Sequence, residues 1–347
     1  MNLDSKIFIA GHKGLVGSAI FNLLLESGYK NIITIDRTKL DLKDEKEVSH
    51  FFAKENIDIV FLAAAKVGGI LANNTYRADF IYENLAIQNS IIYNSYKYKI
   101  KKLLFLGSSC IYPKLSPQPI KEEYLLNGEL EYTNEPYAIA KIAGIKMCES
   151  FNIQYKCNFI SVMPTNLYGK NDNFDFEKSH VIPALIRKIY LAKLLEENNI
   201  KLLKLDLGEN YLEILSKLDI TKDYISLWGN GSARREFLYV DDLANACLFI
   251  MKNINFSNLK SRNTHINIGY GEDISIKDLA FLIKEIIGFR GDIKFSNNNL
   301  DGTPSKLLDV SLLSSFGFKP KVDIKSGIKM VFEDYVNKLH ARLESRN

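Results

Sequence analysis

Apolar residues in the first half of the chain form short continuous runs, separated by segments with helical periodicity. The runs Ile59-Val60-Phe61-Leu62 and Leu103-Leu104-Phe105-Leu106 do not alternate with polar residues, which is typical of parallel strands buried on both faces. The pattern predicts strands near residues 6–10, 31–35, 58–63, 102–107 and 157–163, and helices near residues 15–27, 44–55, 76–98 and 134–155. Strands that alternate with helices in this way indicate an α/β fold, namely a Rossmann-type doubly wound parallel sheet.

The regular alternation ends near residue 165, and loops rich in Asn, Gly and Pro follow, with helical stretches near residues 180–197 and 276–287. The segment 197–224 is rich in Leu, Lys and Glu, and it predicts a solvated helical insertion. We expect two domains: a Rossmann domain of residues 1–165 to which 237–270 returns, and a smaller C-terminal α/β substrate domain of residues 166–236 and 271–335.

The composition is that of an ordinary globular protein, with 46% hydrophobic and 25% charged residues in a length of 347. The net charge of +4 comes without a dense basic block, so it gives little support for nucleic-acid binding. Four cysteines without a C-x-x-C pair argue against a disulfide framework or a zinc site, and we expect no metal. The start of the chain lacks the pattern of a signal peptide, and the apolar run Ile59–Ala65 is too short to span a membrane. We therefore expect a cytoplasmic protein without a membrane partner.

A glycine-rich turn follows the first predicted strand and opens a helix. Its spacing is G-x-x-G-x-x-G, and glycines there allow a tight turn, close approach of the backbone to a pyrophosphate and close packing of helix and strand. The helix N-terminus then presents N–H groups to the phosphates. A purely structural turn is the alternative. The residues of this turn that we expect to contact a dinucleotide are Gly11, His12, Lys13, Gly14, Leu15, Val16 and Gly17.

The sequence points both ways on the choice of cofactor. An acidic residue about 20 positions after the turn favours the free 2′-hydroxyl of NAD, whereas basic residues favour the 2′-phosphate of NADP. Asp36 follows the second predicted strand, but Lys13 and Arg37 flank the same region. NADP(H) is expected, and NAD(H) remains open.

A serine, a tyrosine and a lysine are spaced for acid–base chemistry. Tyr137 and Lys141 lie four residues apart, on one face of a predicted helix. A fixed cation beside a phenol stabilises the phenolate, so the pair can protonate a carbonyl oxygen. Ser108, at the end of the fourth predicted strand, can hydrogen-bond the same oxygen. An amphipathic helix surface is the alternative for Tyr137 and Lys141, but the order of turn, serine strand and Tyr-Lys helix favours chemistry.

With these residues in place, the sequence resembles the extended short-chain dehydrogenase/reductase superfamily, and within it the GDP-L-fucose synthase family of GDP-4-keto-6-deoxy-mannose epimerase-reductases. The resemblance covers nearly the whole chain apart from the 197–224 insertion and the C-terminal tail. It is carried by these stretches: Phe8 to His12, Leu62 to Ile70, Ser108 to Lys114, Asn134 to Lys141, Ser161 to Gly169, Ser179 to Pro183, Arg235 to Phe237, and Asp301 to Pro304.

The resemblance implies epimerisation at C3 and C5 of a GDP-linked 4-keto-6-deoxy sugar, followed by reduction of the C4 ketone with NADPH. The family's reductive residues fall on Ser108, Tyr137 and Lys141, and its epimerase residues fall on Cys110 and His180. A thiolate can remove a proton next to a ketone, and a histidine titrates in the right range to return one. The alternatives are a cysteine that acts as a small hydrophobe and a histidine that hydrogen-bonds a helix start.

The resemblance also implies binding residues. For the cofactor, beyond the glycine turn, they are Asp36, Arg37, Asp41, Leu62, Ala63, Ala64, Lys66, Leu106, Gly107, Tyr137, Lys141, Pro164, Asn166, Leu167 and His180. For the GDP-sugar they are Ser109, Cys110, Asn166, Lys188, Trp228, Arg235 and Asp301. Arginine suits the pyrophosphate because a guanidinium binds phosphate oxygens bidentately. Packing between domains is the alternative for the tryptophan.

Departures from the family pattern leave the exact sugar open. Ser305 stands where an arginine is expected after Thr-Pro, and the insertion borders the substrate side. A C4 reductase of a related sugar such as a GDP-6-deoxy-heptose, without full epimerase activity, is therefore the second hypothesis. A non-catalytic nucleotide-binding scaffold is the third. The resemblance further implies a homodimer that pairs the helices near 76–98 and 134–155, with aromatic surface from Tyr93, Tyr96 and Tyr98.

Overall fold

The structure is a computed structural model, and it describes residues 1–176, 179–259, 263–296 and 303–345. The chain divides into two compact units. The first comprises Met1–Leu167, Val240–Gly271 and Leu307–Lys321, and the second comprises Tyr168–Tyr239, Glu272–Lys306 and Val322–Asn347. The sequence prediction had assigned all of 271–335 to the second domain. The segment Leu307–Lys321 instead belongs to the first unit. It is held there because Ile120 donates its N–H to Leu307 O at 2.7 Å and accepts from Asp309 N at 2.8 Å.

The first unit holds the predicted succession of strands and helices. Its elements are β1 (Ile7–Ala10), α1 (Leu15–Glu26), β2 (Ile32–Ile33), α2 (Glu45–Glu55), β3 (Ile59–Leu62), α3 (Ile70–Thr75), α4 (Arg77–Lys97), β4 (Lys102–Leu106), η1 (Ser109–Ile111), η2 (Glu122–Tyr124), α5 (Glu135–Tyr155), β5 (Phe159–Pro164), α9 (Val240–Asn253), η3 (Phe256–Asn258), β9 (His265–Ile268) and α11 (Ser311–Ser315), with β6 (Asn166–Tyr168) at its boundary.

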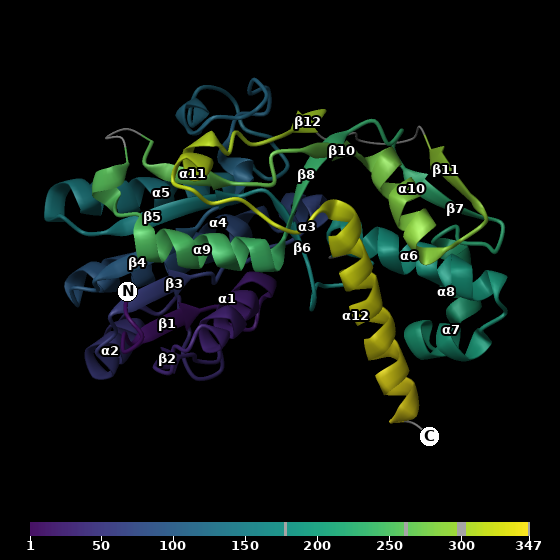
Figure 1. The fold of residues 1–347 in the computed structure, drawn as a ribbon, viewed down its shortest axis with the longest axis horizontal. Coiled ribbons are helices and arrows are strands. Elements are labelled where there is room, and N and C mark those ends of the chain that lie inside the picture. The colour runs from purple at the N-terminus through teal and green to yellow at the C-terminus, as the bar shows by residue number, and fades with distance from the viewer. Residues whose placement is uncertain (177–178, 260–262, 297–302, 346–347) are drawn as a thin grey trace. The chain divides into compact units, whose positions relative to one another are not determined.

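The sheet of the first unit is parallel throughout, with the order β2-β1-β3-β4-β5-β9 (Figure 1). The chain moves outward from β1 to β2 and then returns to the other side of β1 with β3. This reversal creates a switch point between β1 and β3, and ligands of open α/β sheets bind at the carboxyl ends of the strands there. The doubly wound α/β fold predicted from the sequence is therefore confirmed.

Helices cover both faces of this sheet because its strands are apolar on both sides. Helix α9 lies across the near side of the sheet in Figure 1 and packs with α1, while α4 packs with both α2 and α5. Alternate strand residues join the core under α2, α4 and α5, among them Phe8, Val60, Leu103 and Phe105. The helix near 76–98 starts one residue later than predicted, at Arg77, after the separate short helix α3.

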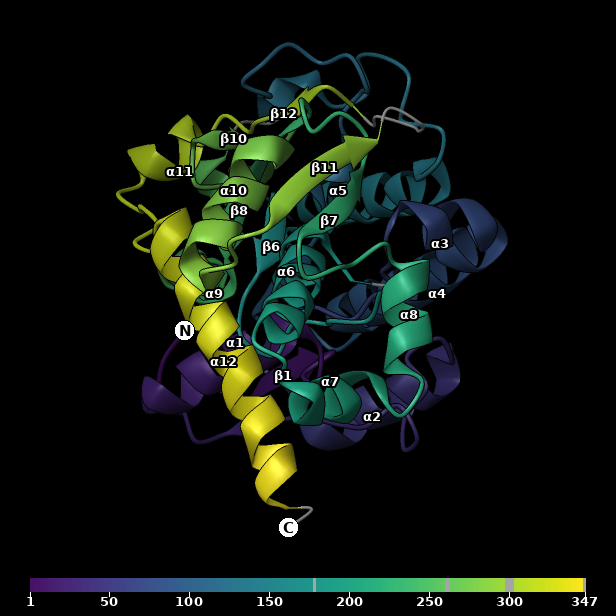
Figure 2. The same ribbon diagram turned by 90° about the vertical axis from the view of Figure 1, so that its right-hand side faces the viewer.

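The second unit consists of helices around two small sheets. Its elements are α6 (Val181–Glu196), α7 (Ile200–Leu207), α8 (Tyr211–Lys217), β7 (Tyr224–Trp228), β8 (Arg234–Tyr239), β10 (Asp273–Ser275), α10 (Ile276–Ile287), β11 (Asp292–Ser296), β12 (Ser305–Lys306) and α12 (Ile324–Glu344). Strand β8 lies between β10, which is antiparallel to it, and β12, which is parallel. Figure 2 shows β11 beside its parallel partner β7.

The insertion is helical, as predicted, and its Lys and Glu residues are largely exposed, but one apolar face of it is buried. Leu202 and Leu203 of α7 and Leu215 of α8 are at most 4% exposed and belong to the core of the second unit. Its leucines recur at helical spacing, so one face is apolar and packs inward while Lys and Glu occupy the other.

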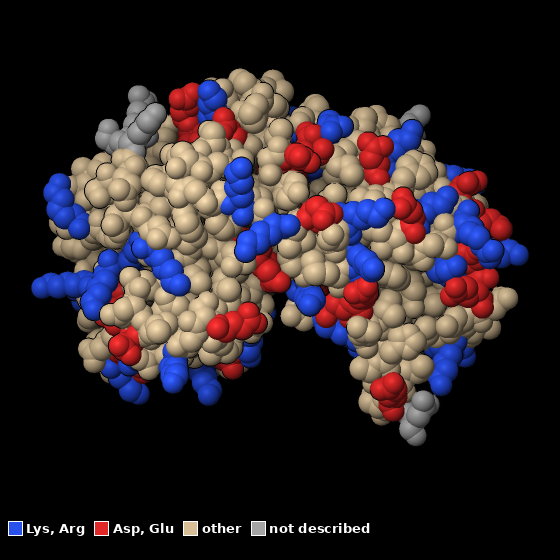
Figure 3. All heavy atoms as spheres, viewed as in Figure 1, with Lys and Arg blue, Asp and Glu red and all other residues tan. Residues whose placement is uncertain are grey.

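No helix in the described part of the chain is long and apolar enough to cross a membrane. On the face drawn in Figure 3, Lys and Arg are interspersed with Asp and Glu.

Candidate active site

The glycine turn after β1 packs tightly against the loop that follows β3. Gly11 has a φ of +91°, and a Cβ built there would lie 2.7 Å from Ala64 N. A Cβ on Gly17 would collide with Gly11 O. Gly14 caps α1 in an extended conformation without a side-chain cap, so the first-turn N–H groups of the helix face outward. The turn therefore has the geometry of a pyrophosphate site at a helix N-terminus.

Asp36 is engaged by cations from the same turn. Lys13 Nζ lies 2.5 Å from Asp36 Oδ1, and His12 Nε2 lies 3.7 Å from the same oxygen. The hydrogen bond from Lys13 lowers the pKa of Asp36, and the charges of Lys13 and His12 act in the same direction. The carboxylate that would favour NAD is thus bonded to a lysine within the protein.

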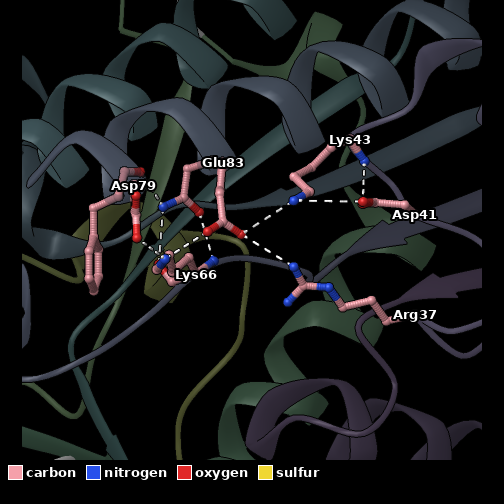
Figure 4. Close-up of polar contacts among 8 residues, drawn as sticks. Arg37, Asp41, Lys43, Lys66, Asp79 and Glu83 are labelled. Atoms are coloured by element: carbon pink, nitrogen blue, oxygen red, sulfur yellow. Dashed lines mark hydrogen bonds and ion pairs between the residues drawn. The ribbon is translucent and has the colours of Figure 1, made fainter. Parts of the chain in front are cut away.

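Three predicted cofactor residues meet in one charged network, which Figure 4 shows. Lys66 Nζ donates hydrogen bonds to Asp79 at 2.9 Å and to Glu83 at 2.6 Å. The bond to Glu83 makes the largest contribution to raising the pKa of Lys66, and the bond to Asp79 adds to it. Glu83 also contacts the Arg37 guanidinium at 3.5 Å and Lys43 Nζ at 3.9 Å. Lys43 in turn lies 3.6 Å from Asp41, another predicted residue. Glu83 of α4 therefore joins the loops that follow β2 and β3.

The catalytic candidates of the first unit are close together at the end of β4. Ser108 Oγ accepts a hydrogen bond from Cys110 N at 3.3 Å. Burial raises the pKa of Tyr137, the nearby Cys110 acts in the same direction, and a hydrogen bond with Ser108 opposes both. The structure therefore brings Ser108, Cys110 and Tyr137 into one site, and the phenol is protonated at neutral pH.

Lys141 is buried close to the Tyr137 ring. Its side chain is 3% exposed, and its Nζ donates to Leu106 O at 2.8 Å. The ammonium stands 5.7 Å from the centre of the Tyr137 ring and 4.9 Å from that of Phe105. Burial lowers the pKa of Lys141 to about 7, so its charged and neutral forms are both accessible at neutral pH.

The helix that carries Tyr137 and Lys141 is fixed by close packing. A Cβ on Gly144 of α5 would meet the Phe105 ring of β4 and come within 3.0 Å of Gln88 Oε1. Gln88 of α4 also donates to Ala140 O at 2.6 Å. These contacts hold α5 against β4, which places the Tyr-Lys pair beside the serine.

Other predicted cofactor residues follow the ends of neighbouring parallel strands. Ala63 N donates to Ala10 O at 2.9 Å, and Gly107 N donates to Val162 O at 2.8 Å, so the ladder continues past the strands. Because all strands run in one direction, these ends share one edge of the sheet. The predicted residues at this edge are Leu62, Ala63, Ala64, Leu106, Gly107, Pro164, Asn166 and Leu167, and Ser109, which is 4% exposed, begins η1 there.

The remaining predicted residues belong to the second unit. His180 precedes α6 as its exposed N-cap residue. Lys188 Nζ donates to Ser226 O at 2.5 Å, and burial lowers its pKa to about 8. Trp228 ends β7 and is 82% exposed, and Arg235 lies in β8 with Nη1 on Arg234 O at 2.7 Å. Asp301 lies outside the described residues.

Ser305, which stands where the family pattern has an arginine, hydrogen-bonds to a neighbouring ion pair. Ser305 Oγ donates to Asp273 Oδ2 at 3.2 Å. The other oxygen of Asp273 accepts two bonds from the Arg234 guanidinium, at 2.9 and 2.7 Å. The serine thus completes the bonding of a carboxylate, and arginine at 234 supplies a cation to this strand.

Sequence reasoning missed a polar residue that holds the loop after β3. Asn84 is 2% exposed, and its amide accepts from Lys66 N at 2.9 Å and donates to Lys66 O at 3.0 Å and Phe80 O at 2.7 Å. The signal lay in the sequence: Asn84 and Gln88 are polar residues at the helical spacing of Ile91, on the buried face of α4.

The chain is similar to known proteins over nearly its whole length. The profile of the NAD dependent epimerase/dehydratase family matches residues 7–269. The chain is 48% identical over 333 residues to GDP-L-fucose synthase 1 of Arabidopsis thaliana, which covers 96% of this chain and 94% of that protein. It is 46% identical over 331 residues to GDP-L-fucose synthase of Escherichia coli strain K12, covering 94% of this chain and 95% of that one.

A solved structure resembles the chain equally well. MlghC from Campylobacter jejuni, described as a GDP-mannoheptose C4 reductase with NADP bound, is 47% identical. The alignment has a TM-score of 0.90 and covers 97% of this chain and 99% of MlghC. Similarity at this level thus extends to proteins named for two different GDP-sugars.

Proposed function

Because the chain belongs to the NAD dependent epimerase/dehydratase family, we propose that it is an NADPH-dependent epimerase and reductase of a GDP-linked 4-keto-6-deoxy sugar. The proposed substrate is GDP-4-keto-6-deoxy-D-mannose, and the product is GDP-L-fucose, the sugar for which the Arabidopsis and Escherichia coli relatives are named. One observation carries the proposal: Ser108, Tyr137 and Lys141 gather at the carboxyl end of β4, on the sheet edge that bears the glycine turn.

The residues present fit a dinucleotide. Gly11 and Gly17 allow the turn to pack closely at the N-terminus of α1, a place where a pyrophosphate would be held. Lys13 occupies the oxygen of Asp36 that would otherwise bond a ribose hydroxyl, and with Arg37 it supplies positive charge for a 2′-phosphate. This arrangement favours NADPH, and the ratio of kcat/KM for NADPH to that for NADH measures the preference.

The reductive step follows from the bonding of the three residues. NADPH, when bound, supplies the hydride that reduces the C4 ketone. Tyr137 donates its proton to the ketone oxygen, and Ser108 donates a hydrogen bond to the same oxygen. Lys141, held on Leu106 O, stabilises the phenolate that Tyr137 becomes.

Epimerisation uses the same oxygen site. Protons on C3 and C5 are acidic because the resulting carbanion is an enolate, whose charge rests on the oxygen that Ser108 and Tyr137 bind. Cys110 and His180 are the proposed base and acid of this step. For the rest of the substrate we propose binding by Ser109, Asn166, Lys188, Trp228, Arg235 and Asp301, with the Arg235 guanidinium on the pyrophosphate.

Reduction of a GDP-4-keto-6-deoxy-heptose at C4, without full epimerisation, is the second candidate, and the similarity to MlghC favours it. NADPH oxidation at 340 nm with the mannose-derived and the heptose-derived keto sugars separates the two. A higher kcat/KM for the mannose-derived substrate supports the first. A higher value for the heptose supports the second, and no oxidation with either contradicts both.

We further propose that the protein is a cytoplasmic homodimer formed by α4 and α5. Tyr96 of α4 stacks on Tyr155 of α5 with ring centres 4.3 Å apart, and the neighbouring Tyr93 and Ile153 are 41% and 53% exposed. Tyr98 does not join this cluster, since its hydroxyl bonds Ser49 of α2 at 2.9 Å. Light scattering of wild type and Ile153→Lys tests the dimer: the variant should be monomeric, and an unchanged mass contradicts the proposed interface.

A further inference from the structure

A buried chain of side-chain hydrogen bonds lies next to the turn that bears Ser108 and Cys110. The Tyr112 hydroxyl is 2.8 Å from His265 Nε2 and 2.5 Å from Asn267 Oδ1. All three side chains are at most 2% exposed. The histidine and the asparagine belong to β9, so the chain of bonds joins the end of the sheet to the segment after β4.

The direction of these bonds follows from the asparagine. Its Nδ2 donates to Ile120 O at 2.9 Å and Asp309 O at 3.2 Å, so its Oδ1 must face Tyr112 and accept. The Tyr112 hydroxyl therefore donates to Asn267 and accepts from His265. Burial lowers the pKa of His265 to about 3, which leaves a neutral ring with its proton on Nε2.

Bonds within the catalytic turn are longer than those at Tyr112. Cys110 N to Ser108 Oγ and Ile111 N to Ser108 O are both 3.3 Å, and Tyr112 N to Ser109 O is 3.4 Å. The contacts of the Tyr112 hydroxyl, at 2.5 and 2.8 Å, are short and buried. Hydrogen bonds weaken with length and strengthen in a buried chain of bonds. The turn is therefore held more firmly by the hydroxyl of Tyr112, at its C-terminal end, than by the hydrogen bonds within the turn.

We propose that Tyr112 is a positioning residue that fixes Ser108 and Cys110 for the reaction by locking the turn to His265 and Asn267. The inference rests on the proposed function for its catalytic consequence. Without the hydroxyl, the turn is free to shift by a fraction of an ångström, and misplacement of about 1 Å costs on the order of 100-fold in rate. Binding of NADPH at the glycine turn does not depend on this lock.

Tyr112→Phe tests the proposal, because it removes one oxygen and keeps the ring. Tyr98→Phe is the matched control, since it removes a hydroxyl that bonds Ser49 in the same unit, away from the turn. We expect kcat for ketone reduction to fall about 10- to 100-fold in Tyr112→Phe, with KM for NADPH within about 3-fold of wild type. Tyr98→Phe should keep the wild-type kcat.

A second pair of variants tests the direction of the bonds. His265→Gln retains an N–H donor for Tyr112, whereas His265→Leu removes it. We expect the glutamine variant to keep kcat within about 3-fold of wild type and the leucine variant to lose about 10-fold or more. Equal loss in both variants contradicts the assigned direction.

Alkylation of Cys110 by iodoacetamide, followed by mass spectrometry, gives a readout that needs no turnover. Tyr112→Phe should change the labelling rate at Cys110 by about 3-fold or more, while Tyr98→Phe should not. Unchanged labelling and unchanged kcat in Tyr112→Phe overturn the positioning role. Changed labelling in a protein whose wild type turns over no GDP-keto sugar upholds the lock and contradicts the proposed function.

Discussion

Replacing Lys141 with methionine should destroy reduction and yet stabilise the protein in acid. Methionine has nearly the volume of the lysine side chain but carries no charge, and Lys141 is 3% exposed. Its pKa falls by burial from 10.5 to about 7. At about 1.4 kcal/mol per pKa unit, this corresponds to about 5 kcal/mol of desolvation cost for the ammonium in the folded state.

The sign of the pH dependence follows from proton binding. Below pH 7 the lysine is protonated both folded and unfolded, and the full cost acts. Between pH 7 and 10.5 the unfolded chain binds more protons, so the free energy of unfolding of the wild type rises with pH. The Met variant lacks this rise, but it loses the bond to Leu106 O, which contributes about 1.5 kcal/mol. The variant should therefore be more stable by about 3 kcal/mol at pH 6 and about equal at pH 9.5.

Urea unfolding of both proteins at these two pH values measures the difference, because other titrating groups are common to both. The reasoning is refuted if the gap between variant and wild type is the same at pH 6 and pH 9.5. A parallel assay of NADPH oxidation should show kcat reduced by about 100-fold or more in the Met variant, since nothing then stabilises the phenolate of Tyr137.

Three further predictions concern the proton donor Tyr137, the glycine turn and the buried lysine Lys102 of the first unit. Tyr137→Phe should lower kcat by about 100- to 10,000-fold in the NADPH assay and leave NADPH affinity within about 3-fold; a wild-type rate would remove the proton donor from the account. Gly17→Ala should weaken NADPH binding about 10-fold or more by fluorescence titration, since its Cβ collides with Gly11 O, and unchanged binding would mean that the turn is not the cofactor site. Lys102→Met should destabilise the protein by about 1 kcal/mol in urea at pH 6, because three bonds from its Nζ to carbonyl oxygens at the end of α9 outweigh the desolvation implied by its lowered pKa; a gain in stability would contradict that balance.

The strands and main helices of the first unit could be predicted because their signals are local. β3 and β4 contain continuous apolar runs, and in the second unit helix α10 likewise occupies the predicted residues 276–287. Strand β2 is only Ile32–Ile33, where 31–35 was predicted, because an edge strand lengthens only while it pairs, and its register with Ile7 and Phe8 ends there. The insertion shows the same limit: its composition suggested solvation, whereas Leu202 of α7 and Leu215 of α8 each lie on a buried face of their own helix.

The bonding of the site could not be predicted, because its partners are far apart in sequence. Ser108, Tyr137 and Lys141 follow from motif order, but Leu106 O as the acceptor for Lys141 depends on how α5 lies on β4. The contact between Tyr112 and Asn267 spans 155 positions and has no spacing rule. Long-range pairs of this kind depend on how whole helices and strands pack against one another. A single sequence carries no periodicity or spacing rule that predicts such packing.

In the proposed mechanism, one oxygen site, formed by Ser108 and Tyr137, serves both epimerisation and reduction. Turnover of GDP-4-keto-6-deoxy-D-mannose with NADPH in heavy water, with NMR analysis of the product, tests it most directly. The expected product is GDP-L-fucose with deuterium at C3 and C5, and the Cys110→Ser variant should lose this deuterium. A product reduced at C4 with protium at both carbons would contradict the mechanism.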